Sequence, residues 1–173
     1  MILKRGFPSS IIVRGFGSAG IPAEVLTCIE QILTHVDAVL TNYSWAAISP
    51  TNIYRGIQFF DGNLDSVPFL TIVPRKAEAG RPIYNVESST MLIDISTIVR
   101  LVDDNPSQVG EAILGEMITA VFSNVPAGAQ AFEYIGGGVD RYPSFNDDLM
   151  TVGMTLSIGW EVTQADPGTC LSN

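Results

Sequence analysis

Two long segments of the chain alternate between apolar and polar residues. Between residues 90 and 101 the odd-numbered positions form one face, and the even-numbered positions carry most of the polar side chains. Residues 150–162 alternate in the same way, with Trp160 and Val162 closing the apolar row. A period of two is typical of a strand with one buried face, so both segments are predicted to be β-strands.

Two other segments repeat their apolar residues every three to four positions, which predicts amphipathic helices. The first helix is expected to start at Pro22 and to continue for about 19 residues, ending near Asn42. The second is expected to open at Pro106, with Asn105 as its N-cap and Gln108 in the third position of a capping box. The apolar positions that carry these predictions are Val25, Ile29, Ile32, Val36 and Leu40, and then Val109, Ile113, Met117 and Val121.

The remaining segments have weaker patterns. Short strands are expected within residues 53–60, 67–73 and 129–135, with a polar loop from Arg75 to about Glu87. The run Gly136–Gly138 predicts either a turn or a place where two backbones approach closely. The fold class is therefore α+β: a mixed, largely antiparallel sheet flanked by two helices. One domain, residues 22–163, is expected between an N-terminal arm, residues 1–21, and a flexible tail, residues 164–173.

Charge is scarce and unevenly placed along the 173 residues. Charged residues make up 16% of the chain and hydrophobic residues 46%, a balance that suggests surfaces buried against other copies. The net charge of −9 disfavours specific nucleic-acid binding. Residues 101–173 carry ten acids and one base, whereas the first twenty residues carry Lys4, Arg5 and Arg14 and no acid. Either these charges are simply solvated, or the basic arm meets the acidic C-terminal third, including Asp147 and Asp148, between neighbouring copies.

The two cysteines, Cys28 and Cys170, are too few for a disulfide framework and lack metal-ligand spacing. They are interpreted as free thiols of a protein made in a reducing cytoplasm. Neither a signal peptide nor an apolar run long enough to cross a membrane is apparent, so a soluble protein is expected.

Candidate chemistry is sparse. Residues 15–20 match GxGxxG, which would allow a dinucleotide-binding turn, but Pro22 falls where such a helix needs its backbone N–H groups. His35 is the single histidine and is interpreted as a structural helix residue. The pairs Asp103-Asp104 and Asp147-Asp148 either bind a hard cation or, as favoured here, occupy turns and a helix start. Without a nucleophile, a base and an orienting group together, no enzyme, metal or cofactor is expected.

The stretch from Tyr84 to Val162 resembles the tail terminator (tail completion) proteins of long-tailed bacteriophages. The resemblance rests on the order of elements and turns, most of all on the glycine run followed by Tyr142-Pro143, and it extends in weaker form over residues 22–163. The segments that carry it are PFLTIVPRKAEAG, SSTMLIDISTIVRLV, NPSQVGEAILGEMITAVF, AFEYIGGGVDRYPSFNDDL and MTVGMTLSIGWEV.

This resemblance implies a structural virion protein, made in the cytoplasm of a host bacterium. Six copies would form a ring that caps the tail tube, stops tube polymerisation and joins the head-side neck. The partners implied are other copies, the tube protein, a neck protein and, in a contractile tail, the sheath, with DNA passing through the lumen. Lys76, Glu78 and Arg81 are then candidates for contacting the tube, although a plain solvated hairpin is the alternative. The rival functions are a stopper-type connector and, more remotely, a nucleotide-binding enzyme that uses residues 15–20.

Overall fold

The computed structural model describes residues 28–56, 67–75, 77–80, 83–101, 105–144, 147–163 and 170–171. The N-terminal arm, the GxGxxG segment and the predicted helix start at Pro22 lie outside these residues. The element order is α1 (Cys28–Asn42), β1 (Ile53–Arg55), β2 (Phe69–Pro74), β3 (Glu78–Ala79), β4 (Val86–Arg100), α2 (Pro106–Phe122), β5 (Ala129–Arg141) and β6 (Leu149–Thr163).

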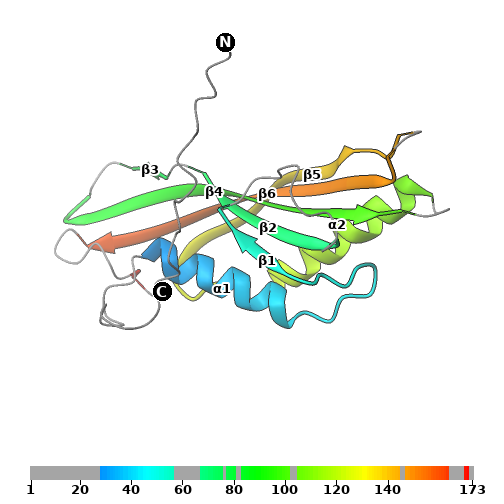
Figure 1. Ribbon diagram of the computed structural model, residues 1–173. Helices are drawn as coiled ribbons and strands as arrows, with labels where there is room; N and C mark the ends of the chain where they lie inside the picture. The colour runs from blue at the N-terminus through cyan, green and yellow to red at the C-terminus, as the bar shows by residue number, and fades with distance from the viewer. Residues whose placement is uncertain are drawn as a thin grey trace, which may run out of the picture.

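The described strands form one sheet with the order β1-β2-β4-β6-β5, and β3 pairs with β4 beside β2. Only β1 and β2 pair in parallel, and the other described pairs are antiparallel. Both helices lie against the same face of this sheet (Figure 1). The α+β class with a mixed, largely antiparallel sheet is thus confirmed. Its pairing differs from the parallel sheet that a dinucleotide-binding fold requires.

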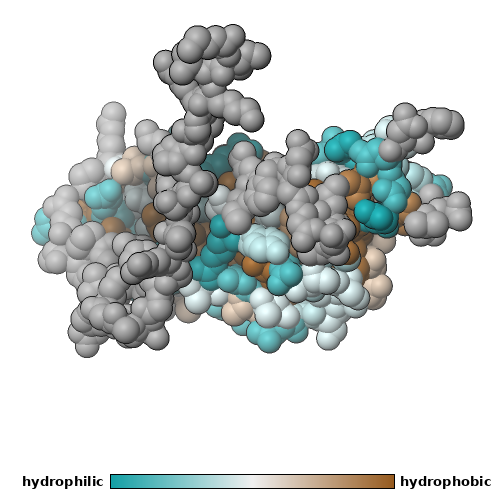
Figure 2. Space-filling model, viewed as in Figure 1, coloured by the Kyte–Doolittle hydropathy of each residue, from teal (hydrophilic) through white to brown (hydrophobic). Residues whose placement is uncertain are grey.

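The core lies between the helices and the sheet, as the apolar periodicities predict. In β4 the odd-numbered residues Met91 to Val99 are buried, and their even-numbered neighbours Asp94 and Ser96 face the other side. The strand β6 buries every even-numbered residue from Met150 to Val162. The residues that α1 and α2 bury in return include Ile32, Val36, Leu40, Ile113, Met117 and Val121. The outward side of α1 is mostly hydrophilic to neutral (Figure 2).

The start of α2 matches its prediction. Asn105 has an extended backbone, and its side-chain oxygen accepts a hydrogen bond from the Ser107 N–H at 3.1 Å. Pro106 occupies the first turn, where a missing N–H costs nothing. The helix ends at Phe122.

Two predictions about the irregular segments need correction. The polar loop of residues 75–87 contains the strand β3, and β4 already begins at Val86, so the segment is largely a hairpin. Its tip is a two-residue turn in which Tyr84 and Asn85 both have positive φ, a geometry that follows the right-handed twist of paired strands. The glycine run is not a turn, because Gly136–Gly138 lie inside β5. The alternative reading of close backbone approach is confirmed at Gly137.

The two cysteines are not free thiols, because Cys28 and Cys170 form a disulfide with a Cα–Cα distance of 5.1 Å. The sequence suggested otherwise because 142 residues separate them, and only the folded chain brings them together. The C-terminal residue Leu171 also docks, since its N–H donates to the Glu161 carbonyl at 2.8 Å. Two residues of the predicted flexible tail, Cys170 and Leu171, are therefore tied to the domain, and the rest of that tail lies outside the described residues.

Candidate functional site

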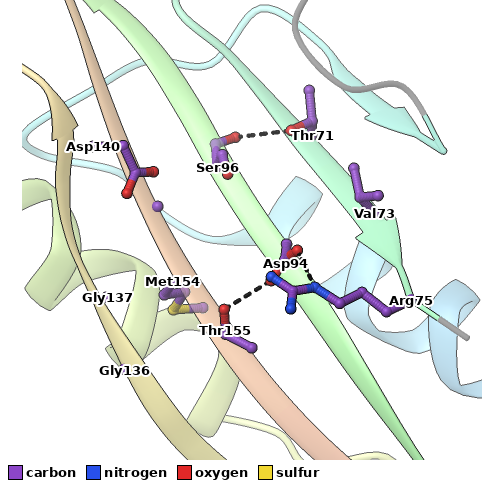
Figure 3. A pocket seen from close by; sticks show the side chains of 11 residues that line it. Thr71, Val73, Arg75, Asp94, Ser96, Gly136, Gly137, Asp140, Met154 and Thr155 are labelled. Carbon is purple, nitrogen blue, oxygen red and sulfur yellow. Dashed lines mark hydrogen bonds and ion pairs between the residues drawn. The ribbon is translucent and has the colours of Figure 1, made fainter.

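The sheet face opposite the helices carries a groove that runs across four strands. It encloses about 470 Å³. The lining residues come from β2, β4, β5 and β6 and from Arg75, which directly follows β2 (Figure 3). The groove-facing side of these strands is the polar side of the alternation, which is why no core forms there.

Asp94 stands at the centre of this groove with both carboxylate oxygens engaged. Arg75 Nε donates to Oδ2 at 2.6 Å, and Thr155 Oγ1 donates to Oδ1 at 2.7 Å (Figure 3). The strand register explains the second bond, because Asp94 and Thr155 are direct partners across β4 and β6. Charge and hydrogen-bonding capacity at Asp94 are therefore already satisfied within the described part of the chain.

Asp140 is the second acid of the groove and is placed differently. It lies on β5, and among the described residues it has neither a hydrogen bond nor an ion pair. Its Oδ2 stands over Gly153, where an added Cβ would lie only 2.5 Å away, so a bare backbone at Gly153 makes room for it. Desolvation, and next to it the negative charge of Asp94, raise the pKa of the Asp140 carboxyl above its usual range. Within the described ranges, Asp140 is thus a carboxylate without a counter-ion.

The outer edge of the sheet at β5 is the second notable surface. The strand runs for 13 residues, ends the strand order, and pairs on its inner side with β6. Tyr134 and Ile135 on this strand are exposed, with Ile135 at 56%. Three register shifts interrupt the β5–β6 ladder, a device that limits edge pairing but does not cover the edge.

The tip of the β3–β4 hairpin belongs to the other edge of the sheet, away from β5. Ile83 is 65% exposed and Tyr84 is 96% exposed, which is unusual for large apolar side chains. Because β3 pairs with the β4 edge that faces away from β6, this tip belongs to the edge remote from β5. The described part of the chain therefore has two different exposed apolar features, one on each edge of the sheet.

The structure describes three of the residues that the sequence analysis singled out as interface candidates, Asp147, Asp148 and Glu78. Asp147 pairs with Arg141 and accepts from the Leu149 N–H at 3.0 Å, so its favoured turn role is confirmed. Asp148 pairs with Arg100 at 3.4 Å. Glu78 is exposed in β3. Lys4, Arg5, Arg14, Lys76, Arg81, Asp103 and Asp104 lie outside the described residues.

His35 has a structural contact, as predicted. It is half-buried on α1, and its Nε2 lies 2.8 Å from the Asn124 carbonyl beyond the end of α2. A second tie between the helical segments was missed by the sequence reasoning. The Glu116 carboxylate accepts from the Ala46 and Ala47 N–H groups, each at 2.9 Å, and so holds the loop after α1 against α2.

The groove itself was not predicted. The alternation placed Asp94 and Ser96 on the polar face, but it gave no partner for either residue. Arg75, Asp140 and Thr155 converge there through strand pairing, which depends on a register that the sequence alone does not reveal. The one sequence feature that could have indicated the groove is Asp140 itself, an acid that shortly follows the glycine run.

The described part of the chain offers neither a cluster of metal ligands nor a membrane-spanning helix. No three His, Cys, Asp or Glu side chains gather there as metal ligands would. Neither described helix is long and apolar enough to span a bilayer. No known family model matches this sequence, and the search of curated proteins found no significant relative.

Proposed function

We propose that this chain is a structural subunit of a bacteriophage tail, which closes with five other copies into a ring on the end of the tail tube. The ring would cover the docking surface of the last tube subunits, stop polymerisation and offer its far side to the head-side neck. It acts by geometric blocking, with no turnover.

The observation that carries this proposal is the long strand β5, whose outer edge pairs with no other described strand and on which Tyr134 and Ile135 are exposed. Sheet edges of this length are usually covered or interrupted in proteins that stay monomeric, because they pair readily with other chains. The exposed Ile83 and Tyr84 lie at the other edge of the sheet. A closed ring needs two different complementary surfaces on each subunit, and these two edges meet that requirement.

The assignment to a tail rests on the resemblance of residues 84–162 to tail terminators. A sheet flanked by two helices is the fold that this resemblance implies, and the described fold agrees with it. The uneven charge adds support, because an acidic lumen repels DNA phosphates and lets DNA pass without binding.

Negative-stain electron microscopy and analytical ultracentrifugation of the full chain test the proposal, first alone and then with tail tubes that lack a terminator. Closed six-fold rings on the tube ends are expected. Ile135→Lys should prevent ring closure, because it places a charge in the contact, whereas Glu111→Lys, at an exposed position of α2 and not on the β5 edge, serves as the control. A two-fold dimer, an open filament, or a chain that stays monomeric with tubes present would contradict the ring.

A further inference from the structure

The groove on the sheet face opposite the helices holds two carboxylates, and only one of them has hydrogen-bond partners among the described residues. Asp94 already accepts from Arg75 and Thr155, whereas Asp140 has no partner among the described residues. Ser96 Oγ also lies beside the bare Gly153, 3.1 Å from where a Cβ would stand. The groove therefore presents an anion and a hydroxyl side by side to whatever occupies it, which suits an ammonium or guanidinium group.

The chain itself contains a segment of matching charge. Lys4, Arg5 and Arg14 lie among twenty residues without an acid. The other acids suggested for this segment are less suitable, because Asp147 pairs with Arg141 and Asp148 pairs with Arg100. Asp140, by contrast, lines the groove and has no cation partner in the part of the chain that the structure describes.

The position of the groove favours a segment from a neighbouring copy. The segment's own domain continues at Cys28, which is buried on the helix-covered face, whereas the groove lies on the opposite face. Gly136, Gly137 and Asp140 line the groove from β5, so the groove is continuous with the edge proposed to meet the next subunit. Arg14 lies fourteen positions before Cys28, a length of chain that spans up to about 45 Å when extended, enough to cross to a neighbour.

We propose that the groove receives the basic N-terminal segment, residues 1–16, of a neighbouring copy, with a Lys or Arg side chain paired to Asp140. This proposal depends on the proposed ring in one respect only, namely that the segment comes from a neighbouring copy. Such an exchange would tie each subunit to the next by a strap in addition to the edge contact.

A binding experiment tests the groove directly. The probe is a fluorescently labelled peptide of residues 1–16, and the receptor is the full chain carrying Lys4→Gln, Arg5→Gln and Arg14→Gln, so that its own segment does not compete. Fluorescence anisotropy should show saturable binding that weakens as NaCl screens the charges. Adding Asp140→Asn to the receptor should weaken binding about tenfold, the loss expected for one charge-assisted contact.

The matched control is Glu133→Gln, which neutralises an exposed acid of the same strand that does not line the groove. The receptor that also carries Glu133→Gln should bind the peptide with the same affinity as the receptor without this substitution. A peptide with Gln at positions 4, 5 and 14 should not bind. Absent binding, or equal binding to the Asp140→Asn and Glu133→Gln receptors, would overturn the proposal.

The source of the segment is tested on the unaltered protein. Equal amounts of ¹⁴N- and ¹⁵N-labelled chain are mixed and treated with a carbodiimide, which joins amines to carboxylates, and the linked peptides are read by mass spectrometry. Links between the N-terminal peptide and the Asp140 peptide should carry mixed labels. Links within one label only would overturn the neighbouring source. Peptide binding without rings would contradict the proposed function alone, and rings without peptide binding would contradict the groove proposal alone.

Discussion

The three consecutive glycines of β5 should respond very differently to alanine. A Cβ at Gly137 would lie 2.5 Å from the Gly153 carbonyl oxygen and 2.9 Å from the Met154 Cα, both on the neighbouring strand β6. At Gly136 and Gly138 a Cβ would meet nothing within 4 Å. None of the three has a positive φ, so alanine fits the backbone angles at each position and steric contact alone separates them.

The magnitude follows from what each methyl group meets. At Gly137 the obstacle is the main chain of the neighbouring strand β6, which cannot rotate away as a side chain can, so overpacking of about 1–3 kcal/mol is expected. At Gly136 and Gly138 alanine removes conformational freedom from the unfolded chain and should stabilise by about 0.4–1 kcal/mol. For a chain of this size each kcal/mol shifts Tm by about 2–4 °C.

Thermal and urea unfolding of the three single variants, followed by circular dichroism, measures these differences. Gly137→Ala should lower Tm by several degrees, and the two flanking variants should leave it unchanged or slightly raised. Equal losses at all three positions would refute the argument, because they would show that the glycines serve a turn or a common backbone requirement. A neutral Gly137→Ala would show that β5 and β6 do not approach as closely as described.

Three further predictions concern the disulfide, Asp140 and Glu116. A thiol titration of the denatured, unreduced protein should find no free thiol. Replacing both Cys28 and Cys170 by serine should lower the free energy of unfolding by up to about 5 kcal/mol in urea titrations, since the bond closes a loop of 142 residues. Because the pKa of Asp140 is raised in the folded state, its ionised form disfavours folding; Asp140→Asn should therefore raise Tm at neutral pH, and the gain should fade as pH falls and the native carboxyl takes up a proton. Glu116→Ala should cost about 1–3 kcal/mol in urea unfolding, because two backbone N–H groups lose a charged acceptor, with Glu111→Ala on the exposed side of α2 as the neutral control.

The elements whose burial is one-sided were predictable from sequence. The segments that became β4, β6 and α2 repeat their apolar residues with one clear period, because each packs one face on a single core. The strand β5 gave no such signal beyond residue 135. Its outer edge is exposed and its glycines carry no side chain, so a continued strand and a turn looked alike. Its hydrogen bonds to β6 decide the conformation there.

The candidate site could not be predicted to the same degree, because its residues meet only through tertiary pairing. Arg75 reaches Asp94 from the end of the adjacent strand, and Thr155 reaches it from a strand 61 residues later. The pairing of Cys28 with Cys170 has the same origin. Composition indicated free thiols, yet in the fold Cys170 lies against Gly128, where a Cβ would stand 2.5 Å from that of Cys170.

The edge and the groove make separable contributions to assembly. Pairing along β5 would bury apolar side chains such as Ile135, so its strength should depend little on salt. A strap held by Asp140 depends on charge and should weaken as the Debye length shrinks, from about 10 Å at 0.1 M salt to about 3 Å at 1 M. Raising the salt should therefore release the segment before the ring opens. The ring would then lose its strap but keep its edge contacts, which distinguishes a reinforcing strap from one on which closure depends.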